Sequence, residues 1–161
     1  MATRSTKGSR PDGEKGFVEG VGILFEDDGL PRMAGRILGR LLVAVPAEQS
    51  SSQLASYLDA SKGSISTMTR QLIQMGLVER VGIPSERQDY FRMRPGGWER
   101  LLTARLRGME RMHLIAEDGL RLPAAKDLDV RARLESMHAV YEFLSTQVPP
   151  LLERFMREQS R

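Results

Sequence analysis

The chain has 161 residues, of which 40% are hydrophobic and 28% charged, a composition that supports one packed domain, with or without an appendage. It contains no cysteine, which excludes disulfide scaffolds, cysteine-ligated zinc, iron–sulfur clusters and thiol nucleophiles. The net charge is only +3, but residues 61–100 carry seven bases against four acids, whereas residues 16–60 carry three against six. This uneven distribution favours a polyanionic partner.

The start of the chain argues against secretion and membrane insertion. Residues 1–16 lack the apolar segment of a secretory signal, and apolar runs such as 41–45 are too short to span a bilayer. We therefore expect a cytoplasmic protein without a membrane partner. Residues 1–15 are polar and basic and predict a disordered tail.

Two helices are predicted before Pro46. The first has an apolar stripe at helical spacing: Phe17, Val18, Val21, Leu24 and Phe25. The second opens at Leu30-Pro31, with a stripe of Met33, Ala34, Ile37, Leu38, Leu41 and Leu42. Glycines within both helices destabilise an isolated helix, so they predict close crossings with neighbouring backbones at Gly20, Gly22, Gly35 and Gly39.

The middle of the chain predicts a helix-turn-helix followed by a hairpin. Ser50–Ser52 offers N-caps for a short helix over 53–58, and a tight turn over 59–61 leads to a helix over 62–75. The inner face of that helix is Ile65, Met68, Leu72 and Met75, and Gly76 ends it. Alternating residues predict strands at 77–81 and 90–93 around a loop at 82–89. Together these elements predict a winged helix.

The remaining chain is predicted to be helical. A helix over 98–117 directs Trp98, Leu102, Leu106, Met109, Met112 and Ala116 inward, and residues 119–123 break it. A second helix covers 127–146, Pro149-Pro150 interrupts, and a short helix covers 151–158. The expected fold class is mainly α (α+β), a winged helix-turn-helix with additional N- and C-terminal dimerisation helices. Three regions are expected: the tail (1–15), a DNA-binding domain with a leading helix (16–97) and a helical dimerisation region (98–161).

The exposed face of the helix over 62–75 is typical of DNA recognition. It carries short hydroxyls, an amide and two cations, and the second helix of a helix-turn-helix enters the major groove. Small side chains permit close approach, and arginine and glutamine read guanine and adenine. We expect DNA contacts from Ser61, Lys62, Gly63, Ser64, Ser66, Thr67, Arg70 and Gln71, and from Ser85 and Arg87 in the hairpin loop. Two alternatives stay open: a merely solvated face, and an Arg87 that pairs with Glu86 or Asp89.

Four stretches resemble a known family: FEDDGLPRMAGRILGRLL at 25–42, LDASKGSIS at 58–66, GLVERV at 76–81 and ERQDYF at 86–91. Through them, residues 16–100 look like the GbsR branch of the MarR-type regulators, which are bacterial winged-helix repressors that bind DNA as homodimers. The resemblance implies that the outer helices form the dimer interface, for which we select Phe17, Val21, Leu144, Leu151, Leu152 and Phe155. The best-known members sense choline or betaine-type compounds, but no residue here carries that specificity over, so a small-molecule effector stays open.

The function expected from these features is sequence-specific transcriptional regulation. No catalytic motif is present, so we expect neither an enzyme nor a cofactor. Two histidines without cysteine partners, His113 and His138, predict no metal site. We expect a homodimeric repressor on a pseudo-palindromic site in double-stranded DNA, with recognition helices about 34 Å apart. The alternatives are a winged helix for protein–protein contact, an architectural DNA-binding module, and a small-molecule-binding or enzymatic dimer whose winged helix is a relic.

Overall fold

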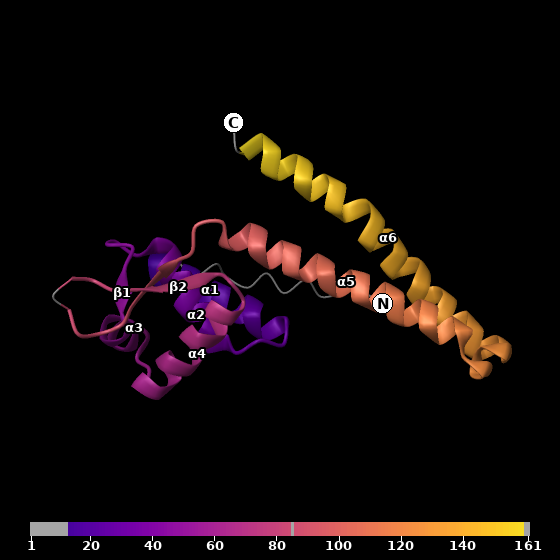
Figure 1. Ribbon diagram of the computed structural model, residues 1–161. Helices are drawn as coiled ribbons and strands as arrows, with labels where there is room; N and C mark the ends of the chain where they lie inside the picture. The colour runs from indigo at the N-terminus through magenta and orange to yellow at the C-terminus, as the bar shows by residue number, and fades with distance from the viewer. Residues whose placement is uncertain (1–12, 85, 160–161) are drawn as a thin grey trace. The chain divides into compact units, whose positions relative to one another are not determined.

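The computed structural model describes residues 13–84 and 86–159, which form two compact units divided between Gly97 and Trp98. The first unit contains α1 (Gly13–Asp27), α2 (Arg32–Val43), β1 (Gln49–Ser50), α3 (Ser51–Leu58), α4 (Lys62–Gln74), β2 (Val78–Val81) and β3 (Tyr90–Met93) (Figure 1). The second unit contains α5 (Gly97–Arg121), which begins at the boundary, the short 3-10 helix η1 (Pro123–Lys126) and α6 (Leu128–Gln159). The predicted fold class, a mainly helical winged helix-turn-helix with extra terminal helices, is confirmed.

The backbones of α1 and α2 pack in direct contact. A Cβ atom added to Gly35 would lie 2.6 Å from the carbonyl oxygen of Val21, and one added to Gly39 would lie 3.0 Å from the Cα atom of Val18. Neither position has room for a side chain, so the close crossing predicted from these glycines is confirmed. The same prediction is wrong for Gly20, where an added Cβ would meet nothing within 4 Å.

Arginines of α2 pair with glutamates of α1 along this crossing. The Nε atom of Arg36 lies 2.5 Å from Oε1 of Glu19, and Nη2 of Arg32 lies 3.2 Å from Oε2 of the same carboxylate. Arg40 pairs with Glu14. Residues 13–15 belong to α1, so the predicted disordered tail is wrong for them. The rest of that tail, residues 1–12, lies outside the described residues.

The predicted apolar stripe of α1 is only partly buried. Val18 and Phe25 are 2% and 9% exposed, whereas Phe17 and Leu24 are 44% and 58% exposed. Gly22 is also buried, like Val18 and Phe25. A Cβ atom added to Gly22 would lie 2.7 Å from the Cγ atom of Arg36, so the arginine side chain fills that space. The inner face of α1 is therefore rotated from the predicted stripe, and Phe17 and Leu24 face away from the core.

The helix-turn-helix closes on a three-stranded antiparallel sheet in the order β1-β3-β2. The strand β1 was not predicted, because its two residues pair only with the distant β3, where Ser50 lies opposite Tyr90. Ser50 also caps α3: its hydroxyl accepts from the amide of Gln53, whose side chain accepts in return from the amide of Ser50. This capping box confirms the predicted serine cap, but the helix begins at Ser51, two residues before the predicted start.

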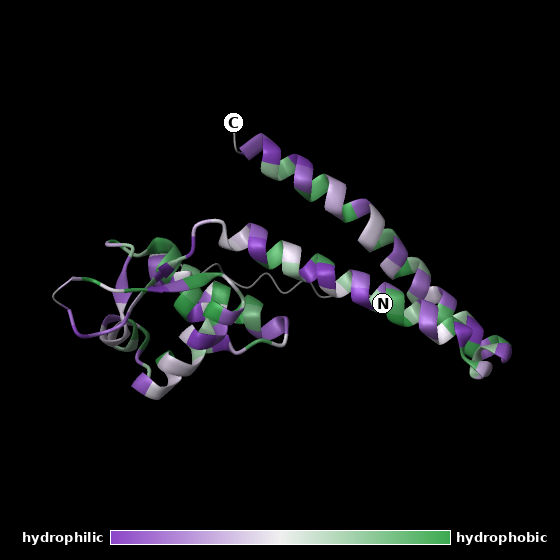
Figure 2. Cartoon of the chain, in the orientation of Figure 1, coloured by the Kyte–Doolittle hydropathy of each residue, from purple (hydrophilic) through white to green (hydrophobic). Residues whose placement is uncertain are grey.

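The core of the first unit lies between the helices and the sheet. Its fully buried apolar side chains come from α1 to α4 and from the segment that enters β2: Val18, Ile37, Leu38, Leu54, Leu58, Ile65, Leu72, Leu77 and Val78. Figure 2 shows hydrophobic residues along the helices of this unit. On α4, Thr69 is buried and Met68 only half-buried, a change from the predicted stripe. The Thr69 hydroxyl donates to the carbonyl of Ile65 at 2.8 Å, which satisfies it inside the core.

The second unit is a pair of long helices joined by η1. The helix α5 continues through the predicted break to Arg121, and α6 runs without interruption through Pro149 and Pro150. The predicted interruption is wrong. The prolines remove the donors for the carbonyls of residues 145 and 146, and α6 has no buried residue, so solvent can take the place of the missing bonds.

Little of the second unit is buried within one chain. Ala116 and Ala125 are its buried hydrophobic residues among those described, and Trp98 and Leu102, predicted to face inward, are 47% and 46% exposed. The two helices touch where Leu134 covers Gly119, leaving 2.8 Å between its Cδ2 atom and an added Cβ. Within the described residues, no helix is long and apolar enough to cross a membrane.

Candidate nucleic-acid interface

The helix α4, which the sequence predicts to contact DNA, starts at a well-defined cap. Asp59 ends α3 in the left-handed conformation, with φ of 50°, and the chain turns at once into Ser61. The hydroxyl oxygen of Ser61 accepts from the amide of Ser64 at 3.2 Å, so this predicted DNA contact also holds the helix terminus. The remaining free amides and the helix dipole make this terminus suited to a phosphate group.

The predicted contact residues share the face of α4 that points away from the core. Ile65, Thr69 and Leu72 are buried, and the opposite side contains no acidic residue. The predicted residues on that side are exposed or half-buried: Lys62, Gly63, Ser64, Ser66, Thr67, Arg70 and Gln71. The structure therefore gathers hydroxyls, an amide and two cations on one helical surface, which we call the recognition face.

The cations of the first unit fall into two groups. Six arginines pair with carboxylates: Arg32, Arg36, Arg40, Arg80, Arg92 and Arg94. Among the described residues, Lys62, Arg70 and Arg87 have no ion pair, and all three are exposed. Lys15 on α1 is the remaining described base of the unit without one. Unpaired charge is thus concentrated on the recognition face and in the hairpin loop, where it is available for an external anion.

The hairpin, or wing, consists of β2, the loop over 82–89 and β3. Asp89 pairs with Arg80 across the base of the loop, with 3.3 Å between Nη1 and Oδ1. Arg87 is left unpaired within the described residues, so the alternative in which it pairs with Glu86 or Asp89 is not observed. The other predicted wing residue, Ser85, lies outside the described residues.

Arg92 anchors the base of the wing. Its Nε atom donates to Glu79 at 2.8 Å and its Nη1 atom to Glu48 at 3.3 Å, and the hydrogen bond to Glu79 contributes most to a raised pKa of Arg92. The contacts join β3 to β2 and to the segment before β1. This arginine therefore supports the sheet, in contrast to Arg87.

The residues predicted for a dimer interface are divided between the two units. Phe17, Leu151 and Phe155 are 44%, 58% and 48% exposed, and Leu144 and Leu152 are half-buried. Val21 packs against α2 of its own chain. Its Cβ atom lies 3.2 Å from the position that a Cβ atom on Gly39 would take. Leu151, Leu152 and Phe155 line an open, apolar hollow of about 380 Å³ with residues of α5.

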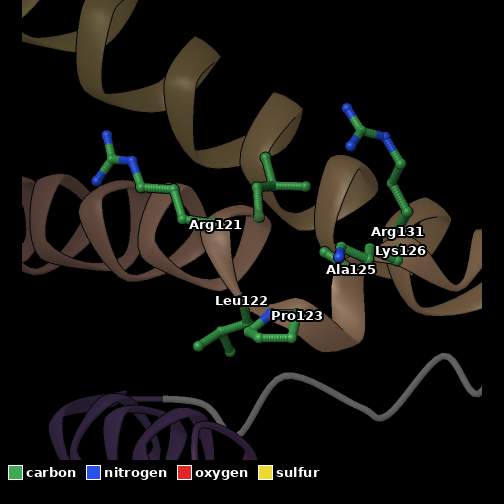
Figure 3. Close-up of a pocket in the computed structure, with 7 residues that line it drawn as sticks. Arg121, Leu122, Pro123, Ala125, Lys126 and Arg131 are labelled. Atoms are coloured by element: carbon green, nitrogen blue, oxygen red, sulfur yellow. The ribbon is translucent and has the colours of Figure 1, made fainter.

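A second hollow lies at the joint between α5 and α6. It measures about 450 Å³ and is lined by Leu122, Pro123, Ala125 and three basic residues (Figure 3): Arg121, Lys126 and Arg131. Figure 3 shows the guanidinium groups of the two arginines pointing to separate sides, and both pair with carboxylates of their own helices. The bases therefore do not converge on a common anion.

The two histidines from which the sequence predicted no metal site belong to one titratable cluster. His113 and Glu117 from α5 lie beside His138 from α6, and all three are half-buried. Their separation in sequence hid the contact, since only the pairing of α5 with α6 brings them together. The spacing of His113 and Glu117, one helical turn apart, was the available signal.

Comparisons with known proteins agree with this architecture. The family model of the MarR family matches residues 36–88, and that of the MmpR5-like MarR family transcriptional regulators matches residues 96–159. The HTH-type transcriptional regulator MmpR5 of Mycobacterium tuberculosis (strain ATCC 25618 / H37Rv) is 39% identical over 148 residues, covering 92% of this chain and 89% of that protein. A crystal structure described as a transcriptional regulator is 40% identical, with a TM-score of 0.75 over 91% of this chain and 99% of the other.

These matches confirm the expected MarR-type family and favour regulators over enzymes. They support the MmpR5-like branch, and the resemblance to the GbsR branch finds no match among them. The chain belongs to the MarR family of DNA-binding, winged-helix transcriptional regulators, in its MmpR5-like branch.

Proposed function

We propose that this chain is a repressor that binds a pseudo-palindromic operator as a homodimer, with the recognition face in the major groove and the wing on the DNA backbone. The observation that carries the proposal is the placement of unpaired cations at Lys62, Arg70 and Arg87, while six other arginines of the same unit pair with carboxylates. An ion pair within the protein would have to break before its arginine could bind phosphate. The three unpaired cations carry no such cost.

The chemistry of each side chain suggests a division of roles. Arg70 and Gln71 have forked donors that match the edges of guanine and adenine. Lys62, Ser61 and Ser64 surround the start of α4, where phosphate binding is favoured, and Ser66 and Thr67 are short enough for close approach. On the wing, Arg87 and Ser85 would contact phosphates or the minor groove. Gly63 would let the DNA backbone approach the helix.

The dimer part of the proposal rests on exposed apolar surface. The helix α6 buries no residue, and four of its large apolar side chains are between 48% and 63% exposed: Val140, Phe143, Leu151 and Phe155. Contiguous apolar surface of this kind marks interaction sites in proteins. A second copy of the same surface would cover it, and we propose residues 98–161 as the dimerisation region and 16–97 as the DNA-binding domain.

The test compares variants on DNA fragments selected from the source genome and on random DNA. We expect Arg70→Ala to weaken binding to a selected fragment about 5- to 150-fold, and less on random DNA, if it reads a base. Lys62→Ala should weaken both equally and reduce the slope of log affinity against log salt by about 1. Fluorescence anisotropy at several salt concentrations measures both effects.

The matched controls are Arg133→Ala and Lys126→Ala, two exposed cations of the second unit. They should bind like the unchanged protein. If Arg70→Ala and Lys62→Ala also bind like it, the recognition face is not the DNA interface. Binding that is sequence-blind in every variant would favour the architectural alternative. The narrower GbsR assignment and a small-molecule effector stay predictions.

A further inference from the structure

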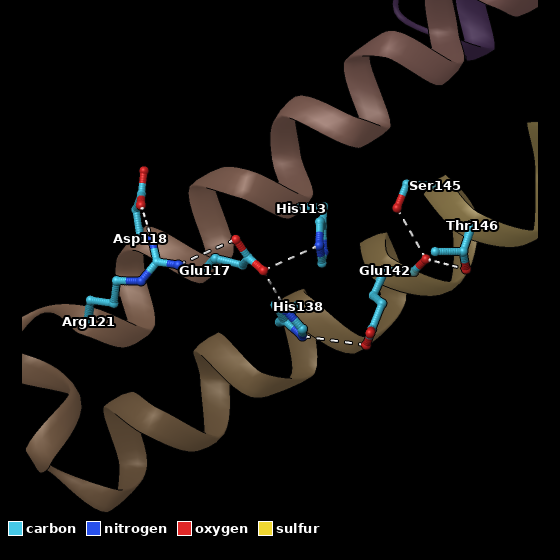
Figure 4. A network of polar contacts seen from close by, with 8 residues as sticks. All are labelled: His113, Glu117, Asp118, Arg121, His138, Glu142, Ser145 and Thr146. Carbon is cyan, nitrogen blue, oxygen red and sulfur yellow. Dashed lines mark hydrogen bonds and ion pairs between the residues drawn. The ribbon is translucent and has the colours of Figure 1, made fainter.

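The cluster of His113, Glu117 and His138 brings three metal-binding side chains to one point between α5 and α6 (Figure 4). The Oε1 atom of Glu117 lies 3.7 Å from Nε2 of His113 and 4.0 Å from Nε2 of His138. The two imidazole rings lie 4.7 Å apart, tilted by 44°. Two imidazole nitrogens and a carboxylate oxygen thus face a common space.

These separations are close to those of a bound zinc ion. Donors at about 2.0–2.1 Å from Zn²⁺ in tetrahedral geometry are about 3.4 Å apart. The ligand atoms available from the three residues all lie within 4.8 Å of one another. Side-chain movements of about 1 Å or less would therefore bring them to the separations of a tetrahedral zinc site. Zinc accepts two histidines and one glutamate, with a fourth position left for water.

Neighbouring groups support this donor set and also compete with it. The Nδ1 atom of His138 lies 3.7 Å from Glu142, the kind of carboxylate that orients a metal-bound imidazole. The Nδ1 atom of His113 is buried without a hydrogen-bond partner, so this ring has a polar atom that the protein alone does not satisfy. Arg121 opposes the site, because its guanidinium lies 3.6 Å from Glu117, although it also pairs with Asp118 at 2.8 Å.

We propose that His113, Glu117 and His138 bind a divalent transition-metal ion of the zinc class, which links α5 to α6. Both helices bury few residues against each other, so a metal link adds stability that packing does not supply. The site lies within the second unit, and the proposal does not depend on DNA binding.

The test titrates Zn²⁺ into the full, tag-free chain after treatment with chelator. The chain has two histidines and no cysteine, so competing soft ligands are few. We expect one Zn²⁺ per chain by calorimetry, with affinity reduced at least about tenfold in His113→Ala, His138→Ala and Glu117→Gln. The control, Glu153→Gln, changes a carboxylate that pairs with Arg157 further along α6, and it should bind like the unchanged chain.

A second measurement needs no variant. Nitrogen-15 NMR of the unchanged chain should show Zn²⁺ shifting the imidazole signals of both histidines, and circular dichroism should show that each variant keeps its helices. The proposal is overturned by an absence of saturable binding, by unchanged imidazole signals, or by histidine variants that bind Zn²⁺ as tightly as the unchanged chain. In that case the cluster is a pair of histidines that lie beside one carboxylate.

Discussion

The two units of this chain differ in the kind of surface that each leaves without a partner. The first unit buries a continuous apolar core and neutralises most of its arginines, and it leaves polar groups and cations free on α4 and the wing. The second unit has little core, and it leaves apolar side chains exposed along both helices. Figure 2 shows hydrophobic and hydrophilic residues alternating along α5 and α6. An exposed cation can pair with an anion, whereas exposed apolar side chains are stabilised when another apolar surface covers them. This difference supports the proposal that the first unit contacts nucleic acid and the second unit contacts a protein.

The largest expected effect tests whether the exposed apolar residues of α6 contact a second copy of the chain. We expect Leu151→Glu to convert a dimer to monomers, because it places a charge in a surface that a second copy would cover. The expected loss is about 2 kcal/mol or more, at least about 30-fold in the dimer dissociation constant. Analytical ultracentrifugation over a range of concentrations measures this constant.

The control for this prediction is Ser136→Glu, which adds the same charge at an exposed polar position of α6. It should leave the dimer intact. A monomeric unchanged protein, or an equally stable dimer in Leu151→Glu, would show that the exposed row serves another partner.

The close crossing of α1 and α2 provides a test of the tight packing that distinguishes the first unit from the second. Gly35→Ala should lower the free energy of unfolding by about 1–3 kcal/mol, since its Cβ would lie 2.6 Å from a carbonyl oxygen. The same substitution at Gly20 meets nothing within 4 Å and should raise it by up to about 1 kcal/mol. Urea denaturation of both variants gives the two values, and equal effects would contradict the tight crossing.

The first unit was largely predictable because its signals are local. The cap at Ser50, the glycine at 76 and the alternation in 90–93 each act on neighbouring residues, and the structure places the cap of α3, the helix α4 and the strand β3 close to their predicted positions. The two-residue β1 was missed because its stability comes from β3, about forty residues further along the chain. Which arginines are paired also depends on tertiary contacts that no spacing reveals.

The second unit was harder because its determinants lie between helices or outside one chain. Prolines 149 and 150 locally predict a break, but α6 passes through them where its carbonyls face water. Trp98 and Leu102 were assigned to a core that one chain does not build. His113 and His138 meet only through the pairing of α5 with α6, and sequence periodicity cannot give that register.

The smallest expected effect separates folding from function at Gly63. A Cβ added there would meet one atom, the Ser61 hydroxyl at 3.9 Å, which is an ordinary contact, so packing within the chain does not require glycine. A close approach of DNA to the start of α4 would require it. We therefore expect Gly63→Ala to keep or slightly raise the free energy of unfolding, because alanine favours the helix, while DNA binding weakens by about 1 kcal/mol, or fivefold.

Thermal denaturation and fluorescence anisotropy on the same preparation measure the two quantities for Gly63→Ala. The matched variant Gly108→Ala, on α5, also has open space for a Cβ, with its nearest neighbour the side chain of Arg111 at 3.9 Å. It should gain helix stability without weakening DNA binding. If both variants bind DNA equally well, the glycine of α4 has no role in the approach of DNA, and the recognition face would have to bind through its longer side chains alone.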